Sequence, residues 1–136
     1  MKALRIDFRN SLRDERGAYF AEFAIVAPVL LLLMFGVMEF GRAVWAYSSV
    51  AHAAREGVRY AIVRGGESGR AATANDVQTY ARSRAGLNAM QVSTTWTPDN
   101  APGSVVQVTA QYDFQSTVPF IPPMQLTSTS RMVISF

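Results

Sequence analysis

The segment Arg16–Gly36, "RGAYFAEFAIVAPVLLLLMFG", decides how this chain of 136 residues is organised. Sixteen consecutive residues from Phe23 to Met38 carry no charge, and extending the run back to Ala18 adds only one charged side chain, that of Glu22. About 20 helical residues, rising ~1.5 Å each, cross the ~30 Å hydrocarbon layer of a bilayer. The run is apolar on every face, and so small a chain could not cover all of it with protein. The sequence therefore predicts a transmembrane helix over residues 18–40.

The charges on either side of this run predict its orientation. Arg42 is the only cationic residue in the twelve positions that follow Met38, whereas five precede the run: Lys2, Arg5, Arg9, Arg13 and Arg16. Because positively charged flanks stay on the cytoplasmic side, we expect a single-pass protein of the bacterial inner membrane with a cytoplasmic N-terminus and a periplasmic C-terminal domain. Pro28 lies inside the span and removes one helical hydrogen bond, so we expect a helix kink there.

Composition narrows the classes of function. The sequence has no cysteine, which excludes disulfides, thiolate zinc sites and a thiol nucleophile. Much of the net charge of +3 arises in the N-terminal flank, which does not resemble a nucleic-acid-binding face. The single histidine, His52, has no carboxylate at a triad spacing, and Asp99 and Asp113 are expected in a turn and on a solvent-facing strand. We therefore expect no enzyme, and no site for a cofactor, metal or small-molecule substrate.

Three interpretations of the basic flank and apolar run remain open. A cleaved secretory signal needs a small-residue cleavage site soon after the apolar run. The candidate "AHA" at Ala51–Ala53 comes thirteen residues after Met38, and "VWA", ending at Ala46, lies inside an unbroken helical pattern. A permanent anchor is the second interpretation. The third is cleavage on the cytoplasmic side of the run, which would remove residues 1–17 as a leader.

The residues around Gly17 favour the third interpretation through a resemblance. The sequence "ERGAYFAEF" resembles a type IV pilin processing site, in which a basic leader ends at Gly17, Ala18 becomes the new N-terminus and Glu22 is the fifth mature residue, next to Phe23. The longer stretch Glu22–Ala61 is similar to the TadE/TadG-like pseudopilins of tight-adherence (Tad, or Flp) pilus systems. The shared features are an acidic residue before an apolar helix, an "EFGR"-like exit and an "AAREGxRYA" ending.

The resemblance implies a minor pilin, a structural subunit that a prepilin peptidase processes and that assembles with other pilins and the Tad machinery. It also implies that Glu22 and Phe23 serve assembly, with Glu22 setting register against the Ala18 amine of a neighbouring subunit. Independently, cleavage after Gly17 would place an amine about one helical turn from Glu22, and such charges stabilise one another near lipid. Alternatively, Glu22 stays hydrated at the interface, where the helix dipole favours it. The competing function is a membrane-anchored periplasmic scaffold or binding domain outside any filament.

Past Met38 the helical pattern continues. We expect residues 41–64 to extend the helix beyond the membrane and Gly65 with Gly66 to stop it. One apolar stripe recurs at helical spacing: Val37, Phe40, Val44, Tyr47, Ala51, Ala54, Val58 and Ala61. Two partners for this stripe are possible, the chain's own distal domain or another subunit, and ordinary amphipathic packing favours the former.

Residues 65–136 are expected to form a small α+β domain. Thr73 with Asp76 forms a capping-box-like start for a short second helix that ends at Gly86. Three runs with period two then follow, beginning near Met90, Val106 and Leu126, and the loops "PDNAPG" and "VPFIPP" separate them. The sequence therefore predicts a long N-terminal helix, a short helix and a three-stranded antiparallel sheet, an arrangement similar to that of pilins.

Overall fold

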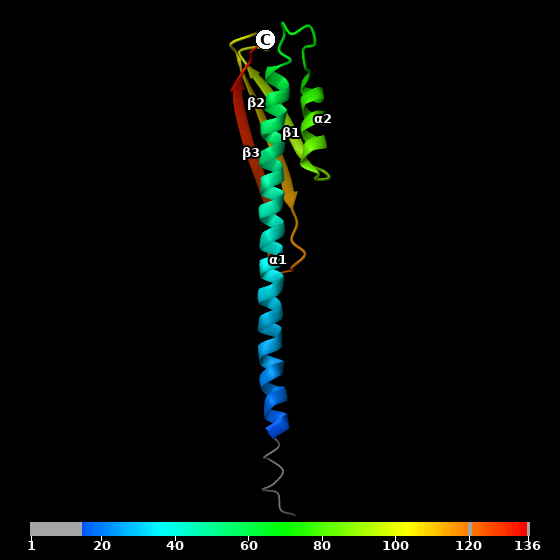
Figure 1. The fold of residues 1–136 in the computed structure, drawn as a ribbon, viewed down its shortest axis with the longest axis vertical. Coiled ribbons are helices and arrows are strands. Elements are labelled where there is room, and N and C mark those ends of the chain that lie inside the picture. Colours follow the sequence, from blue (N-terminus) through cyan, green and yellow to red (C-terminus); the bar gives the residue numbers. More distant parts are fainter. Residues whose placement is uncertain (1–14, 120, 136) are drawn as a thin grey trace, which may run out of the picture. The chain divides into compact units, whose positions relative to one another are not determined.

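The computed structural model describes residues 15–119 and 121–135, and its element order confirms the predicted α+β class. Five elements follow one another (Figure 1): α1 Glu15–Ile62, α2 Ala74–Ala85, β1 Gln91–Thr97, β2 Val105–Phe114 and β3 Met124–Val133. The chain divides into two compact units between Val37 and Met38, and each unit is described by itself below. Most of the predicted leader, residues 1–14, lies outside the described residues.

Helix α2 has the boundaries that its capping residues predict. Thr73 is the N-cap: its hydroxyl accepts a hydrogen bond from the Asp76 N–H at 3.3 Å, and an Asp76 carboxylate oxygen accepts one from the Thr73 N–H at 3.0 Å. This reciprocal pair satisfies two of the N–H groups that a helix start leaves open. At the other end Gly86 adopts a left-handed conformation with φ of 63°, which glycine tolerates without a Cβ clash.

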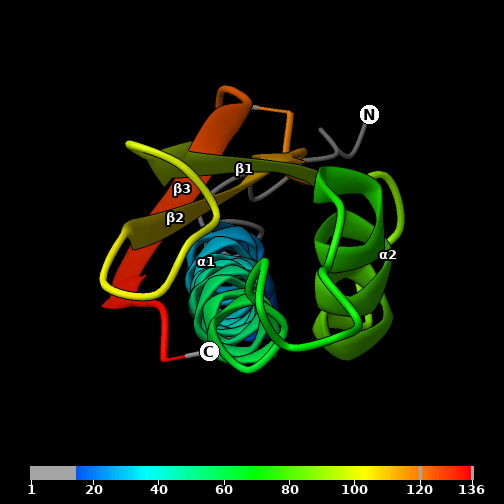
Figure 2. The ribbon, with the colours of Figure 1, turned by 90° about the horizontal axis from the view of Figure 1, so that it is seen from above.

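The three strands form an antiparallel sheet in the order β1-β2-β3. Thr97 pairs with Val105 across the first hairpin, and Phe114 pairs with Met124 across the second. Both helices lie on one face of the sheet (Figure 2), and the other face carries polar residues such as Thr109 and Thr129, whose hydroxyls are 3.0 Å apart. The predicted meander is confirmed. The third strand ends at Val133, and Phe136 lies outside the described residues.

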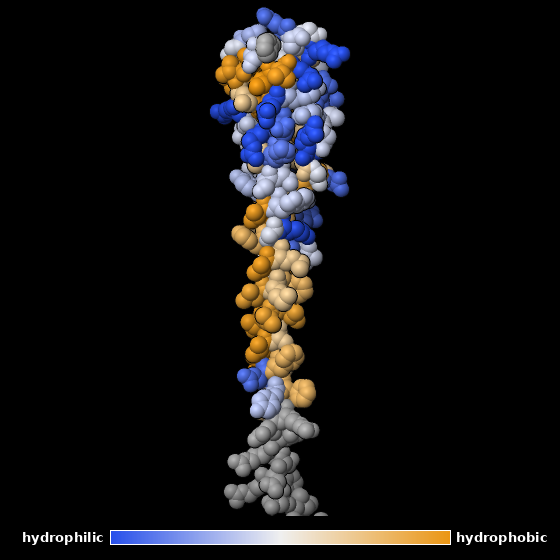
Figure 3. All heavy atoms as spheres, in the orientation of Figure 1, coloured by the Kyte–Doolittle hydropathy of each residue, from blue (hydrophilic) through white to orange (hydrophobic). Residues whose placement is uncertain are grey.

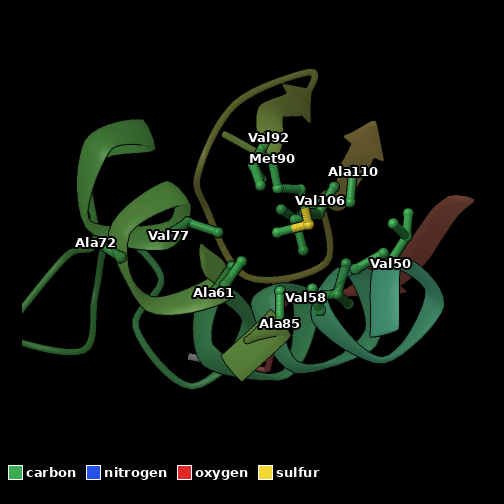
Figure 4. Packing of buried hydrophobic residues seen from close by; sticks show 14 of the residues in the cluster. Val50, Val58, Ala61, Ala72, Val77, Ala85, Met90, Val92, Val106 and Ala110 are labelled. Carbon is green, nitrogen blue, oxygen red and sulfur yellow. The ribbon is translucent and has the colours of Figure 1, made fainter. Parts of the chain in front are cut away.

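The core of the second unit lies between the sheet and the two helices. Valine and alanine supply most of it (Figure 4): Val50, Ala53, Ala54, Val58 and Ala61 from α1, Val77, Ala81 and Ala85 from α2, and Val92, Val106, Val108 and Ala110 from the sheet. Gly57 occupies the point where all three layers meet. A Cβ at this position would lie 3.1 Å from Val108 Cγ1 and 3.2 Å from Ala81 Cβ. The absence of a side chain therefore permits this close approach.

The predicted apolar stripe of α1 is correct only in its second half. Ala51, Ala54, Val58 and Ala61 are buried as expected. The first four positions of the stripe, Val37, Phe40, Val44 and Tyr47, are exposed, and Phe40 retains 71% of its accessible surface. The buried face there comprises instead Glu39, Ala46, Val50 and Ala53, at spacings of seven, four and three residues. A prediction from hydrophobicity alone chose the wrong face of α1 in this region, because the face that packs in the core carries small side chains such as Ala46 and Ala53.

The end of α1 also differs from the prediction in its mechanism. The helix ends at Ile62, but neither Gly65 nor Gly66 has the positive φ of a left-handed cap. Gly66 instead donates its N–H to the Asn100 carbonyl at 2.6 Å, and a Cβ on Gly66 would lie 3.0 Å from that oxygen. This glycine therefore permits a close backbone contact with the β1–β2 loop.

Candidate functional site

The first unit carries the membrane-spanning part of α1. Among the described residues, α1 is the one helix long and apolar enough to cross a membrane. Its large apolar side chains are more than half exposed from Tyr19 through Met38, and Figure 3 shows the hydrophobic surface that they form. So much apolar surface is costly in water and favourable in lipid. Both the sequence and the exposure of this segment therefore support the predicted transmembrane helix.

The predicted processing site lies at the beginning of α1. The described part of α1 begins at Glu15, the Gly17–Ala18 peptide bond lies within this helix, and both residues are exposed. A Cβ added at Gly17 would meet no atom within 4 Å. Packing within this chain therefore does not require glycine at position 17. A requirement for glycine there would have to come from a molecule that binds this bond, and cleavage stays a prediction.

Glu22 and Phe23 are the predicted assembly residues, and both are exposed on α1. Phe23 retains 68% of its accessible surface. Within residues 17–119 and 121–135, no side-chain hydrogen bond or ion pair involves Glu22. The carboxylate is thus available to a partner outside the described part of the chain.

Pro28 lies inside α1, as predicted, and the helix continues through it. Proline has no N–H, so the hydrogen bond that residue 28 would donate to the Ala24 carbonyl is absent. The kink itself stays a prediction.

A second polar site, which the sequence did not single out, lies in the second unit at the end of the uncharged run. Glu39 is only 6% exposed, and its Oε1 accepts a hydrogen bond from the Thr117 N–H at 2.9 Å. Arg42 lies one turn further along α1, and its Nη2 is 3.4 Å from the same Glu39 oxygen. Arg42 also donates to the Thr117 hydroxyl at 2.7 Å and to the Gln115 carbonyl at 2.5 Å. Its guanidinium lies 4.9 Å from the centre of the Phe114 ring.

We call this set of contacts the Glu39–Arg42 link. It joins α1 to the segment that connects β2 with β3, 78 residues further along the chain. Hydrogen bonds to charged groups are shorter and stronger than neutral ones, and the buried Glu39 carboxylate needs such partners. The sequence signal was the "EFGR" motif itself, a carboxylate and a guanidinium at i and i+3 directly after the apolar run. What the sequence could not supply was the backbone N–H of Thr117.

Two aspartates of the second unit, Asp76 and Asp99, serve as cap and turn residues. The Asp76 pKa is lowered by hydrogen bonds from the Thr73 side chain and then from its backbone. The Asp99 pKa is lowered by the Ser104 hydroxyl, at 2.7 Å, and by the Ala101 N–H, at 3.0 Å. This arrangement confirms that Asp99 is a turn residue. Within the described residues, no group of three or more His, Cys, Asp or Glu side chains could hold a metal ion.

Comparison with known proteins gives one family. Residues 17–59 match the family model described as TadE-like protein, which confirms the resemblance found from the sequence. The matched segment begins at Gly17 and includes Glu22, the apolar run, the Glu39–Arg42 pair and Gly57. No curated protein and no solved structure gives a significant match to the chain.

Proposed function

We propose that the chain is a minor pilin, or pseudopilin, of a Tad (Flp) pilus, because residues 17–59 match the family model described as TadE-like protein. In this proposal it is a structural subunit without enzymatic activity. A prepilin peptidase removes residues 1–17, the α1 segment 18–40 holds the protein in the inner membrane, and residues 41–64 with 65–136 form the periplasmic part. The observation that carries the proposal is the family match over the apolar helix together with Gly17 and Glu22 at pilin spacing.

The first step of the proposal is cleavage between Gly17 and Ala18. A peptidase at the membrane face needs an extended and open peptide bond, and α1 must unwind locally to present it. Glycine lowers the cost of leaving the helix by roughly 1 kcal/mol relative to alanine. This property of Gly17 favours processing at this bond.

The second step is assembly through Glu22. After cleavage the Ala18 amine would carry a positive charge close to the membrane, and a carboxylate from an adjacent subunit would stabilise it. In a lipid-like environment an amine and a carboxylate are each costly alone and favourable as a pair. The exposed position of Glu22 on α1 leaves it accessible to another subunit. Glu22 is distant in sequence from the core residues of the second unit, so we expect its replacement to leave folding of that unit unchanged.

The processing step is tested by mass spectrometry and N-terminal sequencing of the protein purified from its own membranes. We expect a mature chain that begins at Ala18. Gly17→Val should retain the leader, whereas the matched control Gly36→Val should be processed normally, since an added Cβ meets no atom within 4 Å at either position. A mature protein that still begins at Met1 would instead favour the membrane-anchored scaffold or binding domain.

The assembly step is tested with Glu22→Ala and with Glu67→Ala as a control for the loss of an exposed carboxylate. Glu22→Ala should be processed and inserted at wild-type levels but should fail to co-purify with other pilus subunits and should abolish piliation. Glu67→Ala should behave as the wild type. Normal piliation by Glu22→Ala at equal protein levels would show that this residue is merely interfacial.

A further inference from the structure

The β2–β3 loop, Gln115–Pro123, approaches α1 where the uncharged run ends. Its Thr117 N–H binds Glu39, the first charged residue after Phe23–Met38, so this loop is fixed at the point where α1 leaves its lipid-compatible segment. Figure 1 shows the loop beside α1, below the sheet. The neighbouring α1 side chains Phe40, Val44 and Trp45 are exposed. Within the second unit, apolar surface on α1 therefore extends past the attachment point of the loop.

The side chains of this loop suit a surface of low polarity. No charged residue occurs between Asp113 and Arg131. Val118 and Ile121 are half-buried, and the prolines at 119, 122 and 123 are exposed, as is Met124 at the beginning of β3. Prolines are ordinary in loops, so the informative features are the lack of charge over the whole loop and the aliphatic Val118 and Ile121.

The described backbone N–H groups from Thr117 to Pro123 also suit an environment with little water. Thr117 donates its N–H to Glu39, Val118 donates to the Ser116 hydroxyl at 3.0 Å, and Ile121 donates to the Val118 carbonyl at 3.1 Å. The three prolines have no N–H to satisfy. Each described residue from Thr117 to Pro123 thus either donates its N–H within the protein or lacks one. Unpaired N–H groups are what keep irregular backbone out of membranes.

Three side chains of α1 that follow Glu39 in the sequence have the chemistry of a membrane interface. Trp45 and Tyr47, both exposed, combine an apolar ring with one polar group, and such residues concentrate at the level of lipid headgroups. The Arg42 side chain remains 45% exposed while it holds the loop. An arginine in this position can place its aliphatic part beside lipid chains and its charge beside phosphate.

We propose that the β2–β3 loop enters the headgroup layer of the bilayer beside α1 and forms a second membrane contact together with Trp45 and Tyr47. The Glu39–Arg42 link holds the loop at that depth. The inference rests on the membrane anchoring contained in the proposed function. A lipid surface fits better than a protein partner, because the loop is attached at Glu39, directly after the uncharged run, and the N–H groups of Thr117, Val118 and Ile121 are satisfied without an external acceptor.

The test uses the absence of cysteine from the full-length chain, since a single introduced cysteine can carry a nitroxide label. The protein is reconstituted in vesicles of phosphatidylethanolamine and phosphatidylglycerol. Labels at Val118→Cys and Ile121→Cys report on the loop, Leu31→Cys reports on the span, and Asn88→Cys reports on an exposed loop after α2. Collision with oxygen, which partitions into lipid, is compared with collision with a water-soluble nickel complex.

We expect the oxygen-to-nickel ratios at positions 118 and 121 to exceed the ratio at position 88 and to shift toward that at position 31. Adding Glu39→Gln should move the loop ratios back toward the aqueous value. Aqueous ratios in the loop with a lipid-like ratio at position 31 would overturn the loop contact and leave the anchor intact. An aqueous ratio at position 31 would overturn both. Protection from both reagents at 118 and 121 would show protein packing and would also overturn the inference.

Discussion

Replacing Gly57 by alanine should destabilise the second unit, although alanine is the better helix former. A Cβ at this position would lie 3.1 Å from Val108 Cγ1 on the sheet and 3.2 Å from Ala81 Cβ on α2. Both neighbours are fully buried, and the Ala81 Cβ is bonded directly to the backbone of its helix. The contact can relax only if α2 or β2 moves away from α1. The substitution therefore acts on the packing of all three layers.

The expected magnitude follows from two opposing terms. Alanine in a helix interior is favoured over glycine by about 0.5–1 kcal/mol. An added methyl group in a close-packed core costs about 1–3 kcal/mol through displaced neighbours. The net loss at Gly57 should therefore be about 1 kcal/mol. For a folded unit of this size, a loss of that amount lowers the thermal midpoint by roughly 4–8 °C.

Gly41 provides a matched control on the same helix. A Cβ at Gly41 would meet no atom within 4 Å. Gly41→Ala therefore gains the helix preference of alanine without the cost of crowding. We expect this variant to be as stable as the parent or slightly more so. The difference between the two variants, about 1–3 kcal/mol, then isolates the cost of crowding at Gly57.

The measurement is thermal unfolding of the full-length protein in detergent micelles, followed by near-ultraviolet circular dichroism. The chain has two tryptophans, and a Trp45→Phe background leaves Trp96 on β1 as the reporter of the second unit. If Gly57→Ala matched Gly41→Ala in midpoint, α1 would not approach the sheet and α2 as closely as these distances state, and the account of this core would be wrong.

Three further outcomes are expected. Thr73→Ala should lower stability by about 1 kcal/mol through loss of the N-cap. Hydrogen bonds from Thr73 lower the Asp76 pKa, so the part of the stability that depends on the Asp76 carboxylate is lost as the pH falls through the lowered pKa. Thr73→Ala removes the hydroxyl donor but keeps the backbone N–H donor, so this step in an acid titration should be smaller than in the parent. Pro28→Ala should restore the hydrogen bond to the Ala24 carbonyl, seen as slower amide exchange around residue 28 in nanodiscs; unchanged exchange would exclude local loosening. Fragments 38–136 and 44–136 should both unfold cooperatively in detergent-free buffer, the shorter at a lower midpoint because it lacks Glu39 and Arg42; a broad, non-cooperative transition of either would contradict independent folding of the second unit.

Local chemistry explains which parts of the fold could be predicted from the sequence. The ends of α2 are determined by Thr73, Asp76 and Gly86, whose effects act within one helical turn. The strands were recognisable because alternating residues meet a core on one side and water on the other. The membrane segment was recognisable from the length of its uncharged run. Each of these signals is contained in a short window of sequence.

The buried face of α1 after Met38 could not be predicted, because apolar residues there do not pack in the core. Phe40 and Tyr47 are exposed, whereas the charged Glu39 is buried. Burial of this carboxylate depends on Thr117, which is distant in the sequence. Thr117 contributes its backbone N–H, and almost every residue type carries such a group, so the residue type gives no sign of the contact. The same limit applies to Gly57, where the need for glycine arises from Val108 and Ala81 on other elements.

The TadE-like segment therefore combines two sets of residues with different physical requirements. Gly17 and Glu22 are exposed, and a Cβ added at Gly17 would meet no described atom within 4 Å, which is consistent with the proposal that both act on molecules outside the chain. Gly57 and the Glu39–Arg42 link have their partners within the second unit, and they determine how the domain packs on its own helix. Residues so far apart, with no shared contacts, should act independently. Changes at the beginning of the segment should thus impair processing or assembly of a folded protein, whereas changes at its end should impair folding itself.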